Sequence, residues 1–131
     1  MADKFLKTTF LLGALAVALG AFGAHALKPL LDEAALKTYQ TATHYHSLHV
    51  VALAIAGILM KLYPSKWFVR AGWLFIAGII FFAGSLYTLT FLKAAGFENV
   101  NWLGAITPLG GLSFISGWIC LFMGVHQWQR S

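Results

Sequence analysis

The chain has 131 residues, of which 60% are hydrophobic and 10% charged, against about 25% charged in an average soluble domain. These polar residues are too few to cover a small water-soluble fold, so the composition predicts a single-domain membrane protein. The net charge of +5 comes from basic residues that stand singly between apolar stretches, which excludes a phosphate-tracking stripe and nucleic acid as an expected partner.

Four charge-free runs locate the expected spans, because a charge at the bilayer centre costs about 2.5 to 3.5 kcal/mol. The runs contain 20, 23, 22 and 31 residues, and a span needs about 20. We expect helices at about 5–27, 44–63, 67–92 and 108–128, the second extended from about 32. Short connections make successive helices antiparallel. The predicted fold class is therefore all-α, a polytopic membrane protein forming one antiparallel four-transmembrane-helix bundle over residues 1–131.

The basic residues are distributed unequally between the two expected membrane faces. One face carries six of them, Lys4, Lys7, Lys61, Lys66, Arg70 and Arg130. The other carries three, Lys28, Lys37 and Lys93. The positive-inside rule then places both termini on the same, cytoplasmic side. We expect a multi-pass protein of the cell inner (plasma) membrane, or of a mitochondrial membrane if the source is eukaryotic.

The first apolar run also has features of a secretory signal peptide. Lys4 and Lys7 precede it, and Ala24-His25-Ala26 resembles a small-residue cleavage site. Cleavage there would leave three spans with reversed ends. We prefer a first span, because the run is long enough to cross the membrane.

Small residues form stripes at helical spacing in the expected spans, and such stripes mark close helix packing in membranes. The best stripe is a heptad-like seam in the fourth helix, where Cys120 stands among glycines and a serine. The positions that we expect to pack helices together are Gly20, Gly78, Gly110, Ser113, Gly117 and Gly124. Contacts within the bundle are the simplest interpretation, and a dimer interface is the alternative.

The beginning of the second helix is unusually polar, with the sequence TYQTATHYHSLH at 38–49. Tyr45, His46 and His49 fall on one helical face that is expected to turn into the bundle. Residues of the other helices reach the same depth and complete a candidate polar or ligand-binding cluster: His25, Tyr45, His46, His49, Ser85 and Tyr87. His44 lies off this face, and His126 lies near the opposite membrane surface.

Four segments resemble a known family. They are GAFGAHAL at 20–27, TATHYHSLHVVAL at 41–53, AGSLYTL at 83–89 and TPLGGLSFISGW at 107–118. In this order they look like the small membrane proteins called domain of unknown function 423, which include YgdD-like bacterial proteins and animal proteins of the transmembrane protein 256 type. The resemblance implies a four-helix membrane protein and carries no established activity. The motif positions that the resemblance implies are Gly23, Pro108, Gly110, Gly111 and all six residues of the polar cluster, which favours a role for the cluster.

Three classes of function remain open. A structural or accessory protein would use the cluster to hold its helices together and would bind a lipid, a second copy of itself or a partner in a membrane complex, without a cofactor. A binding protein would hold a metal, haem or a small ligand, with His25, His46 and His49 as metal ligands. Transport is less favoured, because no Asp or Glu lies inside a span. An enzyme is not expected, because no nucleophile and base pair is present and Cys120 is the only cysteine.

Overall fold

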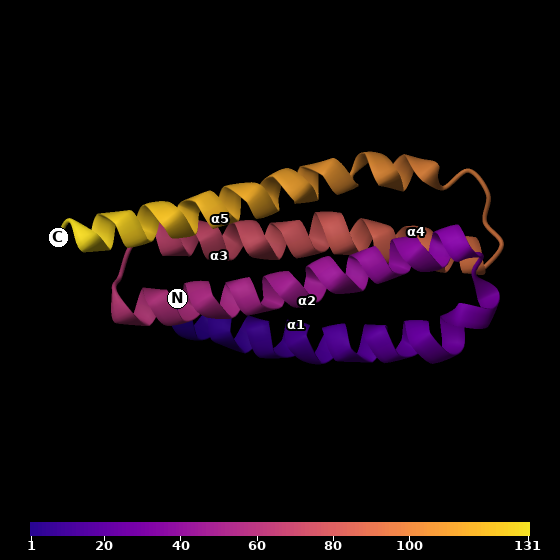
Figure 1. The fold of residues 1–131 in the computed structure, drawn as a ribbon, viewed down its shortest axis with the longest axis horizontal. Coiled ribbons are helices and arrows are strands. Elements are labelled where there is room, and N and C mark those ends of the chain that lie inside the picture. Colours follow the sequence, from indigo (N-terminus) through magenta and orange to yellow (C-terminus); the bar gives the residue numbers. More distant parts are fainter.

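A computed structural model describes all residues 1–131, and it is entirely helical (Figure 1). Four helical rods are long and apolar enough to cross a membrane. The elements in chain order are α1 (Ala2–Phe22), η1 (Gly23–Leu27), η2 (Lys28–Leu30), α2 (Glu33–Leu62), α3 (Lys66–Gly78), η3 (Ile79–Ala83), α4 (Gly84–Ala94), η4 (Asn101–Ala105) and α5 (Thr107–Gln129). The predicted all-α, four-helix fold class is confirmed.

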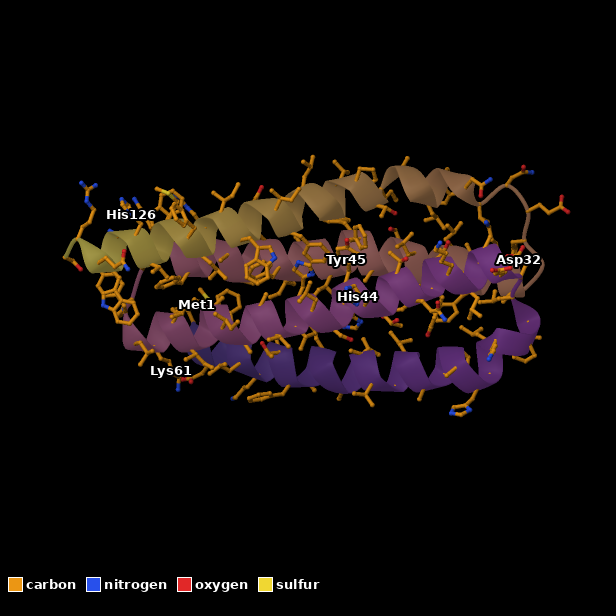
Figure 2. The ribbon with its side chains drawn as sticks, viewed as in Figure 1. Met1, Asp32, His44, Tyr45, Lys61 and His126 are labelled. Atoms are coloured by element: carbon orange, nitrogen blue, oxygen red, sulfur yellow. The ribbon has the colours of Figure 1, made fainter.

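The rods are antiparallel, and both termini lie at the same end of the molecule (Figure 1). Rod α1 packs on α2, rod α3–α4 packs on both α2 and α5, and α1 and α5 lie on opposite flanks. Lys61 and Asp3 form an ion pair of 2.7 Å at the end that carries the termini. Figure 2 shows Met1, Lys61 and His126 near this end and Asp32 near the other.

Side-chain caps determine where two of the helices begin. The Asp32 carboxylate accepts a 2.7 Å hydrogen bond from the Ala35 amide and caps α2. The Ser65 hydroxyl accepts from the Trp67 amide at the start of α3. The first helix is expected to end at about residue 27, but the α1 rod continues through the π-helical η1 and the 3-10 turn η2 to Leu30. Pro29 fits there because proline is tolerated in a first helical turn.

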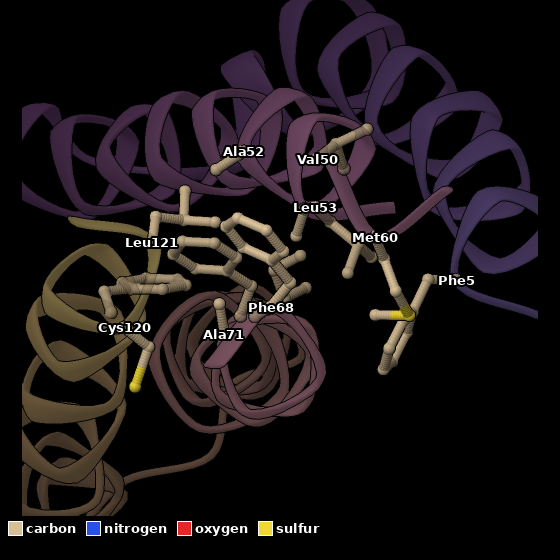
Figure 3. Close-up of a cluster of buried hydrophobic side chains, with 13 residues drawn as sticks. Phe5, Val50, Ala52, Leu53, Met60, Phe68, Ala71, Cys120 and Leu121 are labelled. Carbon is tan, nitrogen blue, oxygen red and sulfur yellow. The ribbon is translucent and has the colours of Figure 1, made fainter. Parts of the chain in front are cut away.

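The main core lies where α3 meets α2 and α5 (Figure 3). Glycines of α5 receive aromatic rings from α3, with Gly117 against Phe75 and Gly124 against Phe68. A methyl group added at either glycine would overlap the opposing ring. The absence of side chains therefore allows α3 and α5 to approach closely, as in small-residue contacts of membrane helices generally.

The third rod and α5 also approach each other closely at two further glycines, one on each rod. Gly78 lies against the Phe114 ring of α5, and Gly110 of α5 lies against the backbone of Phe82 within η3. Ser113 differs from its neighbours in the seam, because it is only partly buried and its hydroxyl donates to the Leu109 carbonyl of its own helix. Ser113 therefore makes no polar link to another helix.

Gly20 is the one expected packing position with no close neighbour. A side chain built there would meet nothing within 4 Å. The close contact of this segment is instead made by Gly23, where an added methyl group would overlap the Tyr39 ring. The prediction of tight helix packing at Gly20 is wrong, because Tyr39 meets α1 almost one turn further along.

Candidate functional site

The predicted polar cluster forms two groups on different sides of α2. His49 and Tyr45 belong to a group that faces α5, while His46 and Tyr87 belong to a group that faces α1 and α4. Figure 2 shows Tyr45 and His44 between the two ends of the molecule. Because consecutive polar positions on α2 point to different neighbours, the helix is linked to both flanks.

His49 is the centre of the first group and is 2% exposed. Its ring stacks on Phe114 with centroids 3.5 Å apart. The Nδ1 atom lies 2.7 Å from the Tyr45 carbonyl oxygen, and the Nε2 atom accepts a 3.1 Å hydrogen bond from the Trp118 indole N–H. Both ring nitrogens of His49 are therefore used within the protein.

These two partners determine which nitrogen of His49 carries the hydrogen. An indole N–H only donates, so Nε2 must accept. A backbone carbonyl only accepts, so Nδ1 must donate. The arrangement selects the neutral tautomer protonated on Nδ1, and neither nitrogen retains a free lone pair for a metal.

His46 is the centre of the second group and is 1% exposed. Its Nδ1 lies 2.9 Å from the Tyr87 hydroxyl oxygen. That hydroxyl has no other partner, so donation from Tyr87 to Nδ1 leaves the fewest unsatisfied groups and places the ring hydrogen on Nε2. Nε2 has no hydrogen-bond partner. Leu12 of α1 lines the same hollow as the His46 ring.

Two further polar contacts extend the cluster toward the Asp32 end. Tyr39 packs edge-on against Tyr87 and its hydroxyl donates to the Leu19 carbonyl of α1. Ser85 of α4 and Thr107 of α5 have hydroxyl oxygens 2.7 Å apart. Together the cluster connects all four rods through side chains, which supports an interhelical role for its polar groups.

His25 does not join the cluster. It is exposed on η1, and no group of three His, Cys, Asp or Glu side chains in the structure lies close enough to hold a metal ion. The expected trio of His25, His46 and His49 does not form, because His25 is exposed while His46 and His49 are buried against different neighbouring helices.

Several residues of the site were not singled out from the sequence. Trp118 supplies the donor to His49, Phe114 supplies its stacking surface, and Tyr39 links α2 to α1. The partner of Tyr39 is the Leu19 backbone carbonyl, which no sequence pattern marks. Phe114 and Trp118 stand four residues apart, a spacing that indicates one helical face but not the histidine opposite it.

Comparison with known protein sequences identifies the family of this chain. The family described as "Protein of unknown function (DUF423)" matches residues 19–111, a range that contains Tyr45, His46, His49 and Tyr87. The chain belongs to this family. It is 41% identical to the UPF0382 membrane protein YwdK of Bacillus subtilis, over 94% of this chain and 99% of that protein.

Other relatives within the family are also bacterial membrane proteins. The chain is 36% identical to the UPF0382 membrane protein SH2409 of Staphylococcus haemolyticus, over 93% of this chain and 98% of that protein. It is 40% identical to a UPF0382 membrane protein of Staphylococcus epidermidis, over 88% and 93% respectively. No solved structure matches the chain. The protein is thus a small membrane protein of a family whose activity is unknown, and it resides in a lipid bilayer.

Proposed function

We propose that this protein is an accessory component of the bacterial inner membrane that works by binding a partner protein or lipid. In this proposal the His/Tyr cluster is an internal brace, defined as His46, His49, Tyr39, Tyr87 and Trp118. The working surfaces are the outward faces of α1 and α5. The excess of basic residues at the end that carries both termini supports a cytoplasmic location for that end.

The observation that carries the proposal is the use of both His49 ring nitrogens within the protein. One joins the α2 backbone and the other joins Trp118 of α5. A histidine arranged in this way holds two helices in register. It has no lone pair to offer a metal or haem, and no free hydrogen to offer a substrate.

The outward faces of the flanking helices supply the surfaces for a partner. Leu11 on α1 and Phe122 on α5 are among the most exposed large apolar side chains. Each flanking rod packs closely against a single neighbouring rod along most of its length. A membrane partner therefore has access to two separate apolar flanks without disturbing the brace.

Photo-crosslinking in native membranes tests this proposal. A photoreactive phenylalanine analogue is placed at Leu11, at Phe122 and, as a control, at Phe97, which lies in the connection between α4 and η4. We expect one defined adduct, with a protein or a phospholipid, at one flank and not at Phe97. Indistinguishable, heterogeneous adducts at all three positions would contradict a specific partner.

A second candidate is ligand binding at His46, favoured by its unpartnered Nε2. The ring borders an apolar hollow of about 250 Å³ between α1 and α4, lined by leucines, isoleucines and Gly84. A metal or haem iron at Nε2 would require the ring hydrogen to move to Nδ1, which would then donate to the Tyr87 hydroxyl oxygen. This imidazole would be the only histidine ligand from the cluster. Cofactor content of the purified protein distinguishes this candidate from the brace.

A further inference from the structure

A groove runs along one side of the α1–α2 contact, and Tyr39 is the one residue of the brace that lines it. It consists of two adjoining hollows that share Gly20 and Thr43. The hollow nearer the Asp32 end has a volume of about 260 Å³ and includes Lys28 and Gln40 in its lining. The second has a volume of about 610 Å³ and continues along the helices to Ala16 and Val51.

The groove exists because the small residues of α1 do not all pack against α2. Gly23 is closed by the Tyr39 ring, which keeps the two helices apart at that level. Gly20, almost one turn earlier, then faces open space with nothing within 4 Å of an added side chain. Larger residues at Gly20 or Ala16 would fill the floor of the groove.

The two ends of the groove differ in charge. At its outer end are the Lys28 ammonium, which forms no ion pair, and the Gln40 side-chain amide. The Thr43 hydroxyl donates to the Gln40 carbonyl, so its oxygen can still accept. At the deep end the lining is uncharged and consists of Ala16, Leu48 and Val51 together with the polar side chains His44 and Ser47.

The length of the groove matches one leaflet of a bilayer. Lys28 and Ala16 are separated by twelve positions along α1, which corresponds to about 18 Å at the helical rise. Half of a hydrocarbon core is about 15 Å. A cationic group therefore lies at headgroup level, and a groove with Gly20 and Ala16 on its α1 side leads from it into the leaflet.

We propose that this groove binds one anionic phospholipid, with its phosphate at Lys28 and Gln40 and one acyl chain along Gly20, Ala16 and Val51. A compact ammonium with amide donors beside it suits a phosphate oxygen. The inference rests on the proposed function and deepens it, because it names the lipid partner and its seat on the α1 side of the molecule.

Native mass spectrometry of the purified full-length protein tests the groove. The protein is incubated with phosphatidylglycerol or with phosphatidylcholine of the same acyl chains. We expect one retained lipid, with phosphatidylglycerol preferred about fivefold, the effect of one basic residue at an anionic headgroup. Inorganic phosphate in excess should not displace it, because the chain in the groove contributes to binding. Equal retention of the two lipids, or displacement by phosphate, would overturn the proposal.

Two variants test the binding of the lipid headgroup and the binding of the acyl chain separately. Lys28→Gln should abolish the preference for phosphatidylglycerol while leaving lipid bound, and Gly20→Leu should reduce retention of both lipids. Lys93→Gln and Gly104→Leu are matched controls, because Lys93 lies at the same end outside the groove and Gly104 also faces open space. If Gly20→Leu does not fold, Gly20→Ala should still weaken retention. Unchanged binding in the folded variants would exclude this groove.

An absence of lipid binding in the groove can be distinguished from a failure of the proposed accessory function. The crosslinking positions Leu11 and Phe122 lie outside the groove lining. A defined protein adduct at Phe122, combined with no preference between the two lipids, would exclude lipid binding in the groove but not the accessory function. A retained phosphatidylglycerol lost in Gly20→Leu would support the groove whatever the crosslinks at α5 show.

Discussion

The Trp118 indole N–H donates to His49 Nε2 over 3.1 Å and thereby connects α5 to α2 across the face of α3. Trp118→Phe removes this donor while keeping an aromatic ring. We expect a loss of about 1 kcal/mol in unfolding free energy, because the Nε2 lone pair is left unsatisfied in a buried site. Thermal unfolding in detergent measures it. Trp102→Phe is the matched control, since Trp102 is exposed and makes no such bond, and an equal loss in both variants would refute the prediction.

The His46–Tyr87 bond gives a second prediction. Tyr87→Phe deletes one hydroxyl and leaves both ring nitrogens of His46 without partners, so we expect a destabilisation of about 1 to 2 kcal/mol. Tyr45→Phe removes a hydroxyl from a residue that is 38% exposed and whose hydroxyl makes no internal bond, and it should change little. Comparing the two melting temperatures checks the prediction, and a larger effect at Tyr45 would contradict it.

Neighbouring glycines on α5 should differ sharply in their tolerance of alanine. At Gly110 a methyl group would overlap the Phe82 backbone, which cannot rotate away, so Gly110→Ala should cost about 2 kcal/mol. At Gly111 the nearest atom of the Phe82 ring is 3.9 Å away, an ordinary contact, so Gly111→Ala should be tolerated. Expression level and thermal unfolding of the two variants provide the comparison. Similar stability of both would mean that η3 and α5 do not approach as closely as described.

The orientation in the membrane is also testable. Six basic residues against three predict that both termini lie in the cytoplasm. Alkaline phosphatase, which requires export, should therefore be inactive when fused after Ser131 and active when fused after Gly96. A fluorescent protein that matures in the cytoplasm should give the reverse pattern. Phosphatase activity at the C-terminus would contradict this orientation.

The fold was predictable from the sequence because two strong constraints coincide in it. Spans must be free of charge, and helices in a bilayer must pack through small residues. Charge-free runs therefore predicted the four rods, and spacing placed Gly117 and Gly124 on one face, where the structure packs them against Phe75 and Phe68.

The details of the site were less predictable because they depend on local changes in helix type. His25 lies exposed on the π-helical turn Gly23–Leu27, and no charge or proline pattern indicates such a turn. His46 and His49 share a helical face but contact different neighbours, α4 and α5, which depends on the positions of these helices around α2. Periodicity predicts that a residue is buried and does not predict the partner that buries it.

Cofactor content of the detergent-purified protein tests the central claim, that the buried histidines brace the helices, most directly. Elemental analysis and visible absorption are compared between the wild type and a His46→Ala, His49→Ala double variant, together with their melting temperatures. The brace predicts no stoichiometric metal or haem in either protein and a lower melting temperature in the variant. A stoichiometric metal or haem in the wild type that is lost in the variant would contradict the brace and establish a binding site at these histidines.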